Sequence, residues 1–161
     1  MMEIKPQQQH EWLQQLRGEW TMEGSCDPGP GEPPMTTTGT ETVRGLGDFW
    51  VVCEGESEMP GGGPGRVLMT LGYDTFKKAF VGSWAGSMMS GMFFYHGTLD
   101  AMGKVLTLDT EGPSFNGDGK TANYQDVITL HSPDERQLHS QVQQADGSWK
   151  RFMTATYRRV K

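Results

Sequence analysis

The stretch of sequence that decides the fold is HEWLQQLRGEW, residues 10–20. Trp12, Leu13 and Leu16 recur in it at helical spacing, with mostly polar residues between them. Gly18 ends this pattern, as glycine commonly ends a helix. Beyond it, apolar and polar residues alternate, which is typical of β-strands. The sequence therefore predicts one short N-terminal helix that leads directly into a β-structure.

The remaining chain is divided into short alternating segments by residues that favour turns. Most of these connections have the length of hairpins, whereas those at 27–34, 60–65 and 113–120 are longer. The predicted strands lie near residues 19–26, 36–45, 48–57, 66–73, 78–86, 91–100, 104–111, 121–130, 136–144 and 148–160. About ten strands in such a meander usually close, because closure removes the exposed edges. We therefore expect an all-β fold: a single closed antiparallel up-and-down barrel, with the helix covering one end and a cavity inside.

Length and composition limit what the protein does. The 161 residues fit a single domain, 1–161, and 35% hydrophobic content is enough for a core. The net charge of −6 disfavours nucleic acid as a partner. No apolar run approaches the roughly 20 residues of a membrane-spanning helix, and the N-terminus has no secretory pattern. Cys26 and Cys53 do not require a disulfide, so we expect reduced thiols in a cytoplasmic protein.

Two motifs at the ends of the chain resemble the calycin pattern of lipocalins and fatty-acid-binding proteins. These motifs are Gly18-Glu19-Trp20 at the start of the first strand and an arginine on the last strand. The resemblance implies that Trp20 lies at the closed end of the barrel. It also implies that Arg158 or Arg159 packs over the Trp20 ring.

A second resemblance covers nearly the whole chain. The segments that carry it are WLQQLRGEW (12–20), LGYDTFKK (71–78), GSWAGSM (82–88), GTLD (97–100) and MTATYR (153–158). They are similar to the uncharacterised bacterial family DUF1579, which implies a calycin-like barrel and no established activity. The chain departs from this family at Gly86, where an acidic residue is expected in many relatives. Any chemistry that needs that acid is therefore absent here.

The segment from Trp84 to His96 is rich in methionine and aromatic residues and is interrupted by Ser and Gly. Methionine side chains are flexible and suit apolar ligands of loosely defined shape. We interpret this segment as a hairpin at the mouth of the barrel and a portal for a ligand. The alternative is that these side chains only fill the core or cover a rim.

Asp126 differs from the other aspartates because it lies within a predicted strand, on the same face as Tyr124 and Ile128. If that face is interior, the carboxylate needs a polar partner, and it could orient a ligand or act as a base with a raised pKa. The alternative is an outward, solvated side chain.

The four histidines, His10, His96, His131 and His139, do not have the spacing of a zinc site. Haem needs one axial histidine in a dry pocket, which His96 or His139 could supply. A solvated or hydrogen-bonded strand histidine is the commoner alternative. Cys53 follows a hydrophobic stretch, which indicates a buried and unreactive thiol.

We expect the barrel cavity to bind a small hydrophobic molecule, and we assign no catalytic residue, metal or cofactor. Apolar contact is expected from Trp84, Met89, Phe94, Tyr124 and Met153, and polar anchors from Ser87, His96, Asp126 and His139. The alternatives are a small enzyme with an acid–base residue in the same cavity, a haem-binding barrel, and a barrel filled by its own side chains. Association into a homo-oligomer stays open.

Overall fold

The computed structural model describes residues 3–27, 29–59 and 62–161. Within these residues the helix α1 is followed by strands only. The elements are α1 (Gln8–Gln14), β1 (Gly18–Cys26), β2 (Met35–Leu46), β3 (Trp50–Glu58), β4 (Pro64–Asp74), β5 (Ala79–Gly86), β6 (Phe93–Leu99), β7 (Val105–Pro113), β8 (Thr121–Ser132), β9 (Glu135–Gln143) and β10 (Trp149–Arg159).

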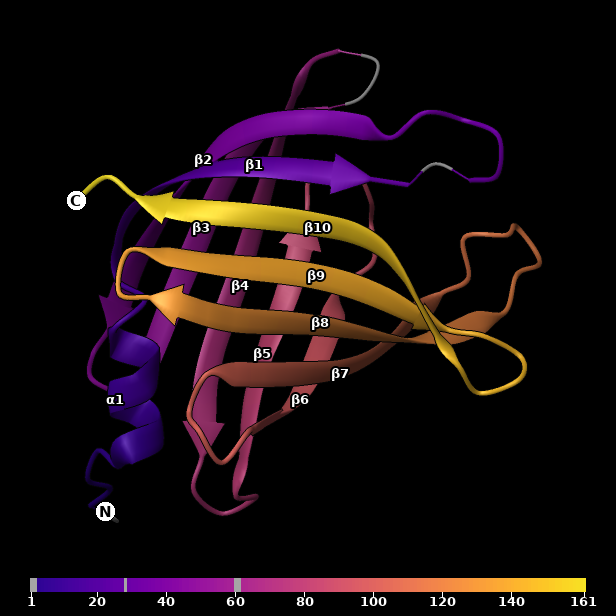
Figure 1. The fold of residues 1–161 in the computed structure, drawn as a ribbon. Helices are drawn as coiled ribbons and strands as arrows, with labels where there is room; N and C mark the ends of the chain where they lie inside the picture. The colour runs from indigo at the N-terminus through magenta and orange to yellow at the C-terminus, as the bar shows by residue number, and fades with distance from the viewer. Residues whose placement is uncertain (1–2, 28, 60–61) are drawn as a thin grey trace.

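The ten strands form a closed antiparallel barrel in which each strand pairs with its neighbours in sequence (Figure 1). Strand β1 closes it by pairing with both β2 and β10, so that Trp20 lies opposite Glu41 on one side and Arg159 on the other. The predicted fold class is therefore confirmed. Two strands begin two residues later than predicted: a turn occupies residues 47–49 before Trp50, and the irregular residues 91–92 precede Phe93.

The two ends of the barrel differ in their connections. Short turns join the strands at the end where α1 lies, and the longer loops project from the opposite end (Figure 1). We call these the covered end and the open end. The described residues of the open-end loops are 27, 29–34, 59, 62–63, 87–92, 114–120 and 144–148.

Helix α1 is held at the covered end by side chains of the stretch that opens the chain. Leu13 and Leu16 are almost completely buried in the core. The ring of His10 accepts a hydrogen bond from the Gln7 N–H through Nδ1, at 2.8 Å, so its Nε2 carries the proton and donates to the Tyr73 carbonyl at 2.9 Å. Each ring nitrogen is thereby engaged, and the helix is attached to the end of β4.

Arg159 completes the covered end. Its guanidinium lies 4.3 Å from the centroid of the Trp20 ring and donates to the backbone carbonyls of Gln15, at 2.9 Å, and Arg17. Arg158 instead points outward and forms an ion pair with Glu135 at 3.3 Å. Of the two arginines that the resemblance left open, Arg159 occupies the position over Trp20.

Gly18 forms the junction between α1 and β1. Its φ of +140° is one that glycine adopts readily, and a Cβ there would lie 2.4 Å from Arg159 Nη1. The sharp change from helix to strand therefore depends on glycine at this position.

Within the described ranges, no helical segment combines the length and apolar character needed to traverse a lipid bilayer.

Candidate functional site

A cavity of about 210 Å³ occupies the open-end half of the barrel. Strand residues form its walls, and residues of the 87–92 and 114–120 loops lie at its mouth. Most of the lining side chains are aromatic or aliphatic. They are Cys26, Trp84, Met89, Phe93, Tyr95, Thr110, Phe115, Tyr124, Asp126, Leu138, Ser140, Phe152 and Met153.

Aromatic rings in edge-to-face or tilted contact surround this space. Phe93 lies 5.8 Å from Trp84 and 6.1 Å from Tyr124, measured between ring centroids. Tyr124 continues the series to Phe115 at 5.4 Å and to Phe152 at 6.2 Å. Such contacts are favourable, and they hold the wall in place.

Gly112 on β7 makes room for one of these rings. A Cβ at this position would lie 2.1 Å from the Phe93 ring. Any larger residue at position 112 would therefore displace Phe93 and change the shape of the cavity.

Asp126 supplies the carboxylate of the cavity. Asp126 on β8 lies directly opposite Ser140 on β9, and Ser140 Oγ donates to Asp126 Oδ1 at 2.5 Å. The hydroxyl of Tyr95, from β6, donates to the other carboxylate oxygen. Burial raises the pKa of Asp126, although the bonds from Ser140 and Tyr95 act in the opposite direction. The pKa of Tyr95 is raised by burial and by the adjacent carboxylate.

The structure brings five of the nine predicted ligand-contact residues together in this cavity. These residues are Trp84, Met89, Tyr124, Asp126 and Met153. They come from β5, the loop that follows it, β8 and β10, so the closure of the barrel is what assembles them.

The other four predicted residues do not line the cavity. Phe94 is 69% exposed, because on β6 its neighbours Phe93 and Tyr95 take the inward positions. His96 is exposed for the same reason. His139 lies between the inward residues Leu138 and Ser140 and so faces the outside. Ser87 lies past the end of β5, where its Oγ accepts a hydrogen bond from the Arg66 N–H at 2.9 Å.

These positions bear on the haem alternative. No histidine is among the described residues that line the cavity, and the His10 nitrogens are both engaged at the covered end. The described lining of the cavity therefore offers haem no histidine as an axial ligand. In the part of the chain that the structure describes, no three His, Cys, Asp or Glu side chains are grouped as metal ligands.

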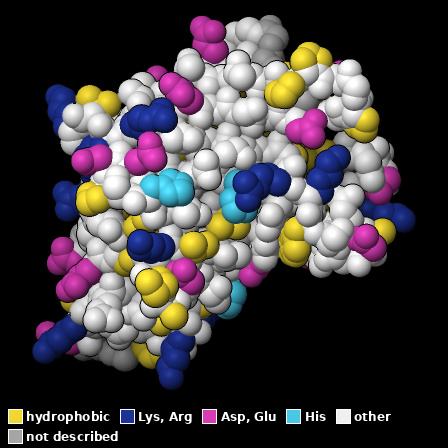
Figure 2. Space-filling model, in the orientation of Figure 1, with side chains coloured by type: hydrophobic (Ala, Val, Ile, Leu, Met, Phe, Trp, Pro, Cys, Tyr) yellow, Lys and Arg dark blue, Asp and Glu magenta, His cyan; other side chains and the backbone are white. Residues whose placement is uncertain are grey.

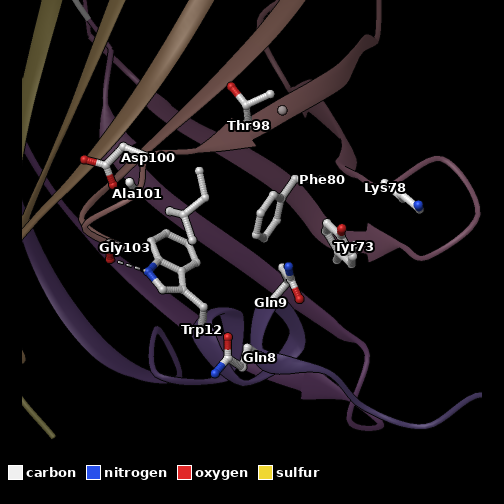
Figure 3. A pocket seen from close by; sticks show the side chains of 12 residues that line it. Gln8, Gln9, Trp12, Tyr73, Lys78, Phe80, Thr98, Asp100, Ala101 and Gly103 are labelled. Atoms are coloured by element: carbon white, nitrogen blue, oxygen red, sulfur yellow. Dashed lines mark hydrogen bonds between the residues drawn. The ribbon is translucent and has the colours of Figure 1, made fainter.

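A separate depression of about 480 Å³ lies between α1 and the β6–β7 turn (Figure 3). Trp12 forms one wall, and its Nε1 donates to the Gly103 carbonyl at 2.7 Å. The Asp100 carboxylate there accepts hydrogen bonds from the N–H groups of Lys104 and Val105. The Trp12 N–H and the Asp100 carboxylate are thus both used to hold the β6–β7 turn.

Three comparisons relate the chain to known proteins. The family model described as "Protein of unknown function (DUF1579)" matches residues 5–159. The crystal structure of Rv2717c from M. tuberculosis is similar, with a TM-score of 0.67, 15% identity, and coverage of 98% of this chain and 100% of that chain. The structure of EF1p2_mFAP2b bound to DFHBI has a TM-score of 0.51 and 14% identity, and covers 94% of this chain and 98% of that chain. No curated protein matches. At these identities the two structures support the barrel fold alone.

Proposed function

The chain belongs to the DUF1579 family, whose description assigns no activity, and we propose from the geometry that the protein binds a small, largely apolar molecule in the open-end cavity. The observation that carries this proposal is the composition of the wall. An aromatic and aliphatic lining surrounds one convergent polar group, formed by Asp126, Tyr95 and Ser140. A mostly apolar pocket with a few placed polar groups is the general form of a ligand site.

The volume limits the size of the ligand. Cavities that enclose drug-sized ligands are about 300–1,000 Å³, and this one is about 210 Å³. The ligand is therefore smaller than that class or leaves one end in the mouth, beside Phe115, which is 66% exposed. Met89 and Met153 can adjust to its shape because their side chains are unbranched.

The fold neighbours are consistent with this use of a barrel. EF1p2_mFAP2b is a barrel of similar shape whose structure was determined with DFHBI bound. This supports small-molecule binding as a use to which a barrel of similar fold can be put. The two chains share only 14% identity, so we infer the ligand class of the present chain from its own cavity residues.

A catalytic role for Asp126 is the second candidate, and the observation that favours it is its raised pKa inside a cavity. In this case the carboxyl group would exchange a proton with the bound molecule. Asp126→Asn distinguishes the two: a carrier still binds ligand, whereas turnover of any substrate stops.

We further propose a cytoplasmic setting, because Cys26 and Cys53 are both free thiols.

Nucleic acid is not among the proposed partners. On the face seen in Figure 2, basic side chains are interspersed with acidic ones and form no continuous patch.

Native mass spectrometry of the protein purified from cells tests the proposal, because a retained molecule is detected by its mass. A titration with the neutral dye N-phenyl-1-naphthylamine complements it. We expect Met89→Trp, which narrows the mouth, to weaken dye binding about tenfold or more. The matched Met102→Trp is expected to have no effect, since Met102 is 77% exposed at the covered end. Equal effects of the two variants would contradict the assignment of the cavity.

A further inference from the structure

Among the described residues, the carboxylates of Glu41 and Asp126 both lie inside the barrel but have different partners. Glu41 forms a buried ion pair with Arg136, whose guanidinium lies between the rings of Trp20, at 4.7 Å, and Tyr157, at 4.1 Å. Asp126 takes part in none of the ion pairs formed between described residues. Its partners are two hydroxyl groups. The charge of Glu41 is therefore compensated within the protein, and that of Asp126 is not.

An uncompensated carboxylate in a low-dielectric cavity is costly, and an added cation reduces that cost. A carboxylate has about four acceptor sites, and the hydroxyls of Tyr95 and Ser140 use only two of them. Both hydroxyls donate, so they favour the ionised carboxylate. The remaining acceptor sites are available to a donor on a ligand in the cavity that Asp126 lines.

The rest of the wall also suits a positive charge. The rings of Trp84, Phe93 and Tyr124 lie next to one another along the cavity. Aromatic faces attract cations, most strongly when the cation is desolvated. Among the described lining residues, none is Lys, Arg or His, so no basic side chain competes for Asp126 or repels a cation. The chain as a whole carries a net charge of −6, which favours the approach of cations.

We propose that the cavity selects a protonated amine attached to a small apolar or aromatic body. The ammonium group donates to the free acceptor sites of Asp126, and the body packs among Trp84, Phe93 and Tyr124. This inference rests on the proposed function, since it names the chemical class of the ligand that the cavity binds. It explains why a buried carboxylate in this barrel lacks a counter-ion when the other has one.

Three probes of similar size and different charge test the proposal: benzylamine, benzyl alcohol and benzoate. Their binding at pH 7.5 is measured by protein-observed NMR titration, which detects weak affinities. We expect benzylamine to bind about tenfold more tightly than benzyl alcohol, and benzoate to bind most weakly. In Asp126→Asn the affinity ratio of amine to alcohol is expected to fall to about one. Asp109→Asn is the matched control: Asp109 is exposed on neighbouring β7, so the ratio is expected to stay unchanged.

The outcomes separate the two proposals. If benzyl alcohol or benzoate binds as tightly as the amine in the wild-type protein, the cation preference is contradicted, while the cavity remains a ligand site. If Asp126→Asn keeps the preference for the amine, Asp126 is not its cause and the proposal is again contradicted. If neither these probes nor the neutral dye binds, the proposed function fails and this inference fails with it. Binding of benzyl alcohol by Asp126→Asn shows that the variant is folded.

Discussion

The hydroxyl of Tyr95 on β6 donates to the carboxylate of Asp126 on β8, across the inner face of the intervening strand β7. In the strand registers Asp126 lies opposite Leu108 of β7, which is fully buried, so the acceptor of this bond lies beside an apolar core residue. A hydrogen bond to a buried charge in such surroundings contributes more than one at the surface. The two residues therefore link one wall of the cavity to the next.

Replacing this donor tests how much the link contributes. Tyr95→Phe is expected to lower the free energy of unfolding by about 1.5–3 kcal/mol, because it leaves a buried carboxylate with one donor fewer. Tyr124→Phe removes a bond to the neutral Pro113 carbonyl, of 2.6 Å, and is expected to cost about 0.5–1.5 kcal/mol. Urea denaturation measures both. A cost for Tyr95→Phe no larger than that for Tyr124→Phe would argue against a buried charge at Asp126.

The raised pKa of Asp126 has a consequence for stability. A carboxyl group whose pKa is higher in the folded than in the unfolded state binds its proton more tightly when folded, so its contribution to stability falls as the pH rises through these pKa values. Asp126→Asn, which is neutral at every pH, is therefore expected to be more stable than wild type at pH 7.

We expect that gain to be on the order of 1 kcal/mol, or about 2–4 °C in Tm for a domain of this size, and to shrink towards pH 4. Thermal denaturation of both proteins across this range measures it. A variant that is less stable than wild type at pH 7 would show that Asp126 is compensated by a group inside the protein.

The two adjacent arginines of β10 provide a matched pair. Arg159→Ala removes one of the two cations over the Trp20 ring, together with the bonds to the carbonyls of Gln15 and Arg17, and is expected to lower the free energy of unfolding by about 2 kcal/mol. Arg158→Ala removes surface ion pairs and is expected to change stability by less than about 1 kcal/mol. Similar losses in the free energy of unfolding for the two variants, measured by urea denaturation, would contradict the role of Arg159 at the covered end.

The two cysteines differ in burial and in their position relative to the cavity. Cys26 lines the mouth and is half-buried, whereas Cys53 is 4% exposed and burial raises the pKa of its thiol far above the usual range. We expect a maleimide to label one thiol in the native protein and both in urea, as counted by mass spectrometry. Saturation with a bound dye is expected to slow labelling of Cys26 at least about threefold. Labelling at an unchanged rate would place the dye elsewhere.

The period of the apolar pattern and the turns between the segments made the strands and the barrel predictable. The phase of each strand was harder to predict. Phe93, Phe94, Tyr95 and His96 are four consecutive ring-bearing residues, so both faces of β6 look suitable for a core and alternation does not select one. The inward residues Phe93 and Tyr95 were missed for this reason.

Ser140 could not be placed opposite Asp126 by counting from the turn. Counting outward from Pro133-Asp134 pairs Ser132 with Glu135 and would set Gln141 opposite Asp126, but an irregularity between Leu130 and Ser132 shifts the register by one residue. Tyr95 and Phe152 could not be placed by counting either. Their contacts with β8 residues cross an intervening strand, and those depend on the curvature of the closed sheet.

The most direct test of ligand binding in the barrel is an NMR titration. The methionine methyl groups of the protein are labelled with ¹³C, and their signals are followed as benzylamine is added. Met89 and Met153 line the cavity, whereas Met102 lies exposed at the covered end. Saturable shifts at the methyl groups of Met89 and Met153, with none at Met102, are the predicted result. Shifts confined to Met102 would contradict a ligand site inside the barrel, and so would the absence of shifts at every methionine together with failure of the neutral dye to bind.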